Sequence, residues 1–160
     1  MIRKAEERDM DALLRVYKAA KAYMVASGNP NQWEEGYPGC VLGRDIQGGN
    51  LYVLCGEDGT VHAAFVFQLE PEPNYAVIEE GAWTSDKPYG TIHRVGSDGT
   101  EKGVFSQCLE FCKTLSPYIR ADTHYDNKTM QHVLEKHGFV PRGIIHVEDG
   151  TPRIAYEYFA

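Results

Sequence analysis

The stretch from Thr91 to Lys113, TIHRVGSDGTEKGVFSQCLEFCK, constrains the fold of this chain more than any other. Residues Thr91–Val95 are rich in β-branched side chains and predict a strand. A polar loop with three glycines follows over 96–103, and apolar residues at helical spacing then predict a helix over 106–113. This order directs backbone N–H groups and a helix N-terminus at a phosphate group. The alternative is an ordinary strand-to-helix turn, because such turns often contain glycine.

Length and charge restrict the class of protein. With 160 residues, the chain has the length of one domain with a substantial core. The formal net charge of −7 argues against nucleic-acid binding and mildly favours cationic substrates such as amines. No apolar run approaches the roughly 18 residues of a membrane span, and the charged N-terminus lacks a signal-peptide core. We therefore expect a single cytoplasmic domain over 1–160, with no nucleic-acid and no membrane partner.

The cysteines predict no special chemistry. Cys40, Cys55, Cys108 and Cys112 have no zinc spacing, and no base is paired with any of them in the sequence. Cys108 and Cys112 are one helical turn apart, which is typical of buried, reduced thiols. The sequence thus predicts neither a metal site nor a nucleophilic cysteine.

Periodicity predicts a mixed α/β chain. Strands are expected at 2–5, 51–55, 61–69, 75–80, 91–95, 119–123, 143–147 and 153–159, and helices from Asp9 to Gly28 and at 41–46, 106–113 and 129–137. The strand–helix–strand order after residue 91 predicts a parallel connection. Ligands of such sheets bind beyond the carboxyl ends of the parallel strands. The loop at 96–103 and the HYDN segment at 124–127 are therefore expected to meet at one site.

Nearly the whole chain resembles the GCN5-related N-acetyltransferase (GNAT) family. The opening IRKAEERDMDALLRVY is similar to the first strand and helix of that family, and IHRVGSDGTEKGVFSQCLEFC lies where the family has its fourth strand and pyrophosphate loop. IRADTHYDNKTMQHVLEKHGFVPRG is similar to the fifth strand and the following helix, and DN…EKHGF is the most specific match. The resemblance implies a mixed, mostly antiparallel twisted sheet with two splayed parallel strands, flanked by helices.

The same resemblance implies a reaction. An amine would attack the thioester of acetyl-CoA directly, while backbone donors of the central strand hold the acyl carbonyl and the pantetheine, with no metal. The chain would then be an acetyl-CoA-dependent N-acetyltransferase for a small-molecule or amino-acid-like amine. The acceptor's identity and a homodimer are left open.

Two residues depart from the family's pattern. Phe105 places a ring where the phosphate loop usually allows close backbone approach, and Leu134 stands where a tyrosine often protonates the leaving thiolate. Two alternatives therefore remain. One is a non-catalytic acyl-CoA-binding or regulatory module on the same fold, and the other is a phosphate-ligand binder unrelated to CoA.

His93 and Glu80 are the candidate catalytic residues. Alternation along the strand places His93 on the same face as Thr91 and Val95. Some family members use a general-base histidine at this position, and the pKa class of histidine suits deprotonation of an ammonium. The alternative is a structural histidine. Glu80 could recruit a cationic amine or act through water, and its alternative is a solvated strand end.

Cofactor and acceptor binding have their own candidates. The resemblance implies cofactor contacts by Arg94, Val95, Ser97, Lys102, Gly103, Val104 and Asn127. Arg94 could instead pair with an internal acid, and Asn127 could cap the following helix. The candidates for the wall of an acceptor pocket are Trp33, Tyr37 and Trp83, because aromatic faces suit amines. Ordinary packing is the alternative for each of the three.

Overall fold

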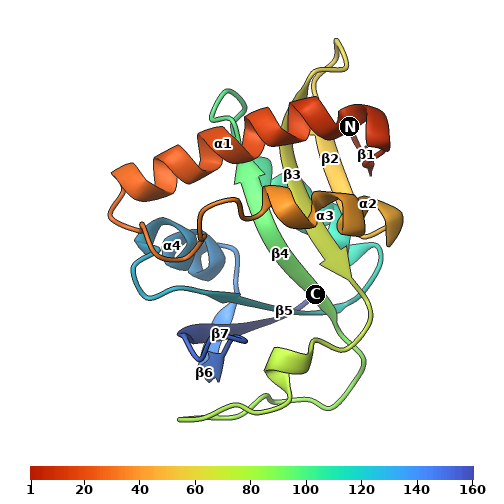
Figure 1. The fold of residues 1–160 in the computed structure, drawn as a ribbon. Helices are drawn as coiled ribbons and strands as arrows, with labels where there is room; N and C mark the ends of the chain where they lie inside the picture. Colours follow the sequence, from red (N-terminus) through yellow and green to blue (C-terminus); the bar gives the residue numbers. More distant parts are fainter.

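The computed structural model describes all 160 residues and contains one seven-stranded sheet with helices on both faces (Figure 1). The strands are β1 (Ile2–Lys4), β2 (Leu51–Cys55), β3 (Val61–Gln68), β4 (Gly90–Ser97), β5 (Tyr118–Thr123), β6 (Val140–His146) and β7 (Pro152–Phe159). The helices are α1 (Met10–Ala26), α2 (Leu42–Gln47), α3 (Val104–Lys113) and α4 (Lys128–Lys136), with 3-10 turns η1 (Glu7–Asp9), η2 (Gly39–Val41) and η3 (Pro73–Tyr75). The sheet order is β1-β2-β3-β4-β5-β7-β6, and only β4 and β5 pair in parallel. The predicted mixed, mostly antiparallel sheet is confirmed.

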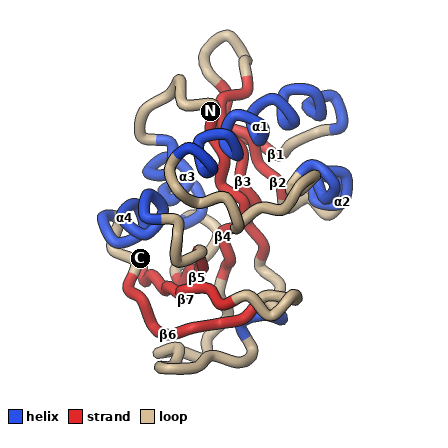
Figure 2. The backbone as a smooth tube through the Cα atoms, turned by 60° about the vertical axis from the view of Figure 1, so that its left-hand side comes forward, coloured by secondary structure: helices blue, strands red, loops and turns tan.

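The two faces of the sheet bury separate apolar clusters. Leu13 and Val16 of α1 and Leu42 of α2 pack on one face against residues of β2 and β3. Cys108 of α3 and Leu134 of α4 belong to the cluster on the other face. Figure 2 shows these helix pairs on opposite sides of the strands. None of the helices combines the length and apolar character needed to cross a membrane.

The cysteines are free thiols, as expected. Cys55, Cys108 and Cys112 are buried, and Cys40 is exposed. Burial raises the pKa of the Cys108 thiol to about 12, which leaves it protonated and unreactive at neutral pH.

The strand predicted at 75–80 is wrong. Glu72 accepts a hydrogen bond from the backbone N–H of Asn74, and Pro73 occupies the first position of η3, so this segment begins as a 3-10 turn. A single isolated bridge, Glu79 to Ile144, is the only ladder contact that follows. The connection from β3 to β4 (69–89) is therefore a long loop that contains η3, and no strand forms in it; we call it the β3–β4 loop.

Strand β4 contains a bulge that alters the direction of its side chains. Val66 pairs with His93 and Ala64 with Gly96, so Arg94 and Val95 together lie opposite one residue of β3. Arg94 adopts a left-handed conformation with φ 48°, and the Tyr17 hydroxyl donates to its carbonyl oxygen at 2.7 Å. Because the bulge breaks the alternation, the prediction that Val95 shares a face with His93 is wrong.

Strands β4 and β5 diverge soon after they meet. Their parallel pairing is confined to Gly90 with Ile119 and Thr91 with Arg120. Both strands then continue, to Ser97 and Thr123, without pairing to each other, and Figure 1 shows them moving apart. This separation opens the middle of the sheet beside the bulge.

Candidate active site

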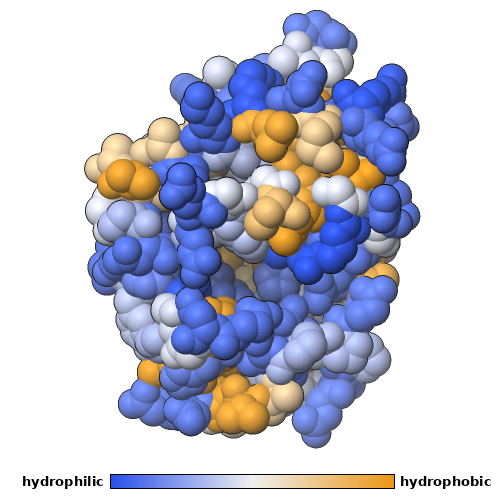
Figure 3. Space-filling model, in the orientation of Figure 1, coloured by the Kyte–Doolittle hydropathy of each residue, from blue (hydrophilic) through white to orange (hydrophobic).

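A cleft of about 1080 Å³ lies where β4 and β5 separate. Its lining comes from the end of α1, the loop at 27–41, the bulged part of β4, the start of α4 and the β6–β7 turn. In Figure 3 this face is hollowed below α1 and α2, and hydrophilic residues surround much of the hollow. The expected meeting of the β4–α3 loop with the segment after β5 is confirmed, because Asp98, Gly99, Asp126 and Asn127 all line this cleft.

His93 lines the cleft and is paired with a carboxylate. Its Nε2 lies 3.3 Å from Oε2 of Glu72, and both side chains are mostly buried. Burial raises the pKa of Glu72, but hydrogen bonds from His93, the Asn74 N–H and Gln68 together lower it below its usual value. Glu72 therefore remains ionised and can only accept hydrogen bonds. Sequence reasoning missed Glu72, because the PEPN segment that contains it was interpreted only as a break in the strand pattern.

A second pair lies nearby and joins Tyr75 of η3 to Asp122 of β5. The Tyr75 hydroxyl donates to Oδ2 of Asp122 at 2.6 Å, and the Tyr75 ring lies 6.3 Å from that of His93. Burial, followed by the charge of Asp122, raises the pKa of Tyr75 well above its usual value, so the phenol stays protonated. Asp122 thus presents a hydrogen-bonded carboxylate at the cleft.

Acidic side chains dominate the charge of the lining. The carboxylates are Glu34, Asp45, Glu72, Asp98, Asp122, Asp126, Glu148 and Asp149, and the cations are Arg44, Arg94, Lys128 and Arg153. Such a lining attracts cationic molecules over anionic ones.

Arg94 pairs with an acid inside the protein, which was the alternative to its predicted role at a phosphate. Its Nη2 lies 2.9 Å from Oδ2 of Asp45, and its Nη1 donates to the Tyr37 hydroxyl at 3.0 Å. These contacts connect the bulge to α2 and to the loop after α1. Trp33 and Tyr37 line the cleft at this end, with their ring centroids 6.2 Å apart.

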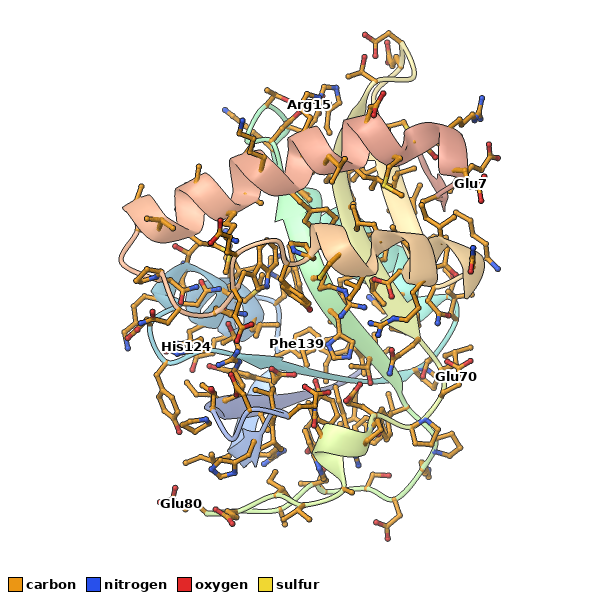
Figure 4. All side chains as sticks on the ribbon, in the orientation of Figure 1. Glu7, Arg15, Glu70, Glu80, His124 and Phe139 are labelled. Carbon is orange, nitrogen blue, oxygen red and sulfur yellow. The ribbon has the colours of Figure 1, made fainter.

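Two predicted site residues lie outside the cleft. Glu80 is exposed in the loop that replaces the predicted strand, and Figure 4 shows it at the outer edge of the molecule. Trp83 packs over the guanidinium of Arg120, 4.1 Å from its ring centroid, and donates to the Tyr75 carbonyl at 3.0 Å. Neither residue lines the cleft, so the structure does not support the predictions of a catalytic Glu80 and of an acceptor wall at Trp83. The Glu80 prediction rested on a strand that does not form, and the Trp83 prediction rested on the suitability of aromatic faces for amines.

The β4–α3 loop leaves donors free for an anion. The backbone N–H groups of Val104, Phe105 and Ser106 make no backbone hydrogen bond at the start of α3. Gly103 caps this end with a left-handed φ of 66°, and nothing lies within 4 Å of the space its side chain would occupy. Ser97 and Val104 line the cleft, while Lys102 and Gly103 are exposed beside it.

Phe105 does not obstruct this loop. Its ring packs into the core, with centroids 5.1 Å from His137 and 6.0 Å from Phe139. Leu134 is also buried, at 1% exposure, and places no hydroxyl group at the cleft. Of the two departures from the family's pattern, only Leu134 therefore changes the chemistry available in the cleft.

Asn127 uses its side chain within the protein. Its Oδ1 accepts from the Met130 N–H at 3.0 Å and caps α4, which confirms the capping alternative. Its Nδ2 donates to Oε1 of Gln32 at 3.0 Å, which joins the start of α4 to the loop after α1. Val95, the remaining cofactor candidate, lines the cleft beside the bulge. No group of three or more His, Cys, Asp or Glu side chains is arranged to hold a metal ion.

Comparisons with known proteins give matches among solved structures. No protein-family model matches the chain, and no curated protein sequence matches it. An acetyltransferase of the GNAT family from Streptococcus agalactiae is 30% identical with a TM-score of 0.89, over 100% of this chain and 95% of that one. A GNAT-family acetyltransferase from Listeria monocytogenes is 19% identical with a TM-score of 0.74, over 100% and 94% of the two chains. A chain of the NatC complex bound to Gag peptide and CoA is 13% identical with a TM-score of 0.62, over 100% and 98%. The last two support the fold alone.

Proposed function

This chain belongs to the GNAT family of acetyltransferases, and we propose that it transfers an acetyl group from acetyl-CoA to the amine of a small-molecule or amino-acid-like acceptor by direct attack. The observation that carries the proposal is the ionised Glu72 beside His93, in a cleft that opens where β4 and β5 separate. The acidic lining supports a cationic acceptor. A cytoplasmic location remains an expectation from the sequence.

The residues present fit acetyl-CoA, which would supply an activated thioester. The free N–H groups at the start of α3 and the exposed ammonium of Lys102 suit its diphosphate. The backbone of β4 at the bulge suits the acyl carbonyl and the pantetheine, because a bulge leaves ladder groups unpaired. A structural neighbour bound to CoA adds support for this choice of co-substrate.

We assign the role of general base to His93. Because Glu72 is ionised and accepts only, the ring proton of a neutral His93 lies on Nε2, which leaves Nδ1 free to accept a proton. An acceptor amine reaches the cleft as an ammonium and must lose a proton before it attacks. His93 takes that proton, and Glu72 stabilises the resulting imidazolium. With Leu134 buried in the family's usual acid position, we assign no side-chain acid to the leaving thiolate.

Release of the free CoA thiol tests the proposal. Native mass spectrometry with acetyl-CoA should first show a complex, and a panel of small amines should then release thiol from it. His93→Ala should lower turnover about 100-fold or more while leaving the affinity for CoA unchanged. His146→Ala is the matched control, because His146 is exposed on β6 and lies outside the cleft. Binding of acetyl-CoA without thiol release across the panel would contradict catalysis and support a non-catalytic CoA-binding module.

A further inference from the structure

Arg153, at the start of β7, is a buried guanidinium with no ion-pair partner. The residue is 7% exposed and lines the cleft, and its Nη1 has no hydrogen-bond partner. Its Nη2 makes one long hydrogen bond, 3.4 Å, to the carbonyl oxygen of Gln32. We propose that Arg153 is the receptor for a carboxylate group of the acceptor, so that the amine acetylated by this enzyme belongs to an amino acid or a related amino-carboxylate. This inference rests on the proposed function and specifies its substrate class.

The other arginines that are largely buried all have partners. Arg94 is paired with Asp45, and Arg142 with Glu157, whose carboxylate lies 2.6 Å away. Arg120 lies between the rings of Trp83 and Tyr89, at 4.1 and 4.0 Å from their centroids, and makes two further hydrogen bonds. Arg153 has neither an ion pair nor an aromatic face. A buried charge is costly unless it is paired, so this site is complete only when an anion binds.

A second unsatisfied polar atom lies in the same part of the cleft. Asn29 is 2% exposed and leaves its Oδ1 without a partner, while its Nδ2 donates to Oε1 of Gln32 at 3.0 Å. Gln32 therefore connects Asn29 to Arg153 and, through the same Oε1, to Asn127. One unpaired donor and one unpaired acceptor around a single glutamine form a polar subsite for a ligand that carries an anion and a hydrogen-bond donor.

The position of Arg153 favours the acceptor over the phosphates of CoA. Its only bond is to the loop after α1, which also contributes Trp33 and Tyr37 to the cleft. The free N–H groups suited to a diphosphate lie elsewhere, at the β4–α3 junction. Burial, followed by the charge of Arg153, lowers the pKa of the neighbouring His124, against a smaller opposing effect of Asp126. The charge of Arg153 also acts on Asp149, which is exposed. A planar carboxylate matches the two parallel N–H groups of a guanidinium.

Calorimetry on the protein saturated with CoA tests the assignment without requiring turnover. The probes are the twenty natural amino acids and their carboxamides, in which a neutral amide of similar shape replaces the carboxylate. We expect at least one amino acid to bind wild-type protein about 30- to 100-fold more tightly than its carboxamide, the range for a charge-assisted bidentate pair. Arg153→Gln should reduce that ratio to near one, and Arg153→Lys should retain part of it.

Matched controls separate this assignment from general electrostatics and from the function itself. Arg44→Gln removes another cation of the cleft lining, one whose side chain is 71% exposed, and should leave the ratio unchanged. Thermal melts check that each Arg153 variant is folded. A ratio near one for every amino acid in wild-type protein, or an undiminished ratio in folded Arg153→Gln, would overturn the assignment. A loss of CoA affinity in Arg153→Gln as large as its loss of amino-acid affinity would also overturn the assignment, because the arginine would then bind a phosphate. If amines that lack a carboxylate release thiol and the affinity ratio of amino acid to carboxamide is near one, the acetyltransferase proposal holds and the assignment of Arg153 fails.

Discussion

Glu72 and His93 are 21 positions apart in the chain, yet Oε2 of one lies 3.3 Å from Nε2 of the other inside the cleft. Glu72 precedes η3 and His93 lies in β4, so the pair joins the β3–β4 loop to the central strand. The same carboxylate accepts from the Asn74 N–H and from Gln68, which limits its motion. The imidazole is thereby oriented before any substrate arrives.

Removing the charge of Glu72 should impair catalysis more than folding. Glu72→Gln keeps an oxygen for the Asn74 N–H but no longer stabilises an imidazolium, so we expect turnover to fall about 10- to 100-fold. Steady-state kinetics and calorimetric titration with CoA measure the two effects separately. Glu70→Gln is the control, since Glu70 is exposed nearby in the same loop (Figure 4). Equal turnover in wild type and Glu72→Gln would remove this carboxylate from the mechanism.

The bulge in β4 depends on a glycine that admits an aromatic ring. A methyl group on Gly96 would lie 2.9 Å from two ring atoms of Tyr17, whose hydroxyl holds the Arg94 carbonyl. Gly96→Ala should therefore destabilise the protein by about 1–3 kcal/mol, as overpacked cores do, and should lower turnover because the bulge moves.

Urea unfolding measures that cost, and Gly43→Ala provides the comparison. Gly43 lies in α2 with nothing within 4 Å of its missing side chain, so alanine should be neutral or stabilising by up to about 1 kcal/mol. Equal stabilities for the two alanine variants would show that the Tyr17 ring moves aside at little cost and that the bulge is not tightly held.

Lys102 should contribute to CoA affinity and Arg94 should not. Lys102 is exposed beside the free N–H groups of α3, whereas Arg94 is committed to Asp45. Lys102→Ala should weaken CoA binding about two- to fivefold at low salt, with a smaller effect at high salt. Calorimetric titrations at two ionic strengths measure this.

Two variants serve as controls for that measurement. Lys113→Ala removes a lysine from the far end of α3, where it is paired with Glu110, and should leave CoA affinity unchanged. Arg94→Met should lower the unfolding free energy by about 3 kcal/mol, because Asp45 loses its partner, with little effect on CoA affinity. A large loss of CoA affinity in Arg94→Met at unchanged stability would restore the phosphate role of Arg94.

The buried Glu157 should make the protein sensitive to acid. Burial raises the pKa of Glu157, but hydrogen bonds from Thr84, Tyr118 and Arg142 together lower it below the value of 4.5 for a free side chain. A lowered folded-state pKa contributes stability that is complete above about pH 4.5 and is lost as pH falls through the folded pKa.

Urea unfolding between about pH 7 and about pH 3 should show this loss in the wild type. Glu157→Gln should be less stable by about 2 kcal/mol at neutral pH, with a shallower decline in acid, because it has no carboxylate to protonate. Glu57→Gln, at an exposed hairpin turn, should follow the wild-type curve. Parallel acid curves for Glu157→Gln and the wild type would assign the acid sensitivity to other carboxylates.

The local pattern of apolar residues in the sequence predicted much of the fold. The residues of α3 and α4 repeat at helical spacing and the hairpin strands alternate or run apolar, so these elements could be predicted from neighbouring residues alone. The order of β4, α3 and β5 then implied their parallel pairing. The strand prediction for 75–80 was wrong because the apolar residues of this segment also suit a loop that packs on the sheet, as Tyr75 does.

The amino-acid sequence by itself determined the mixed sheet, the glycine loop before α3 and the place of His93 on the central strand. Only the tertiary structure decided that Glu72 meets His93, that Arg94 pairs with Asp45 instead of a phosphate, and that Arg153 is buried without an ion pair. Periodicity reports which face of an element is apolar, since burial repeats with the element's own geometry. Which side chains of distant segments meet depends on the packing of the loops and on the shift at the β4 bulge, and neither leaves a repeating signal in the sequence.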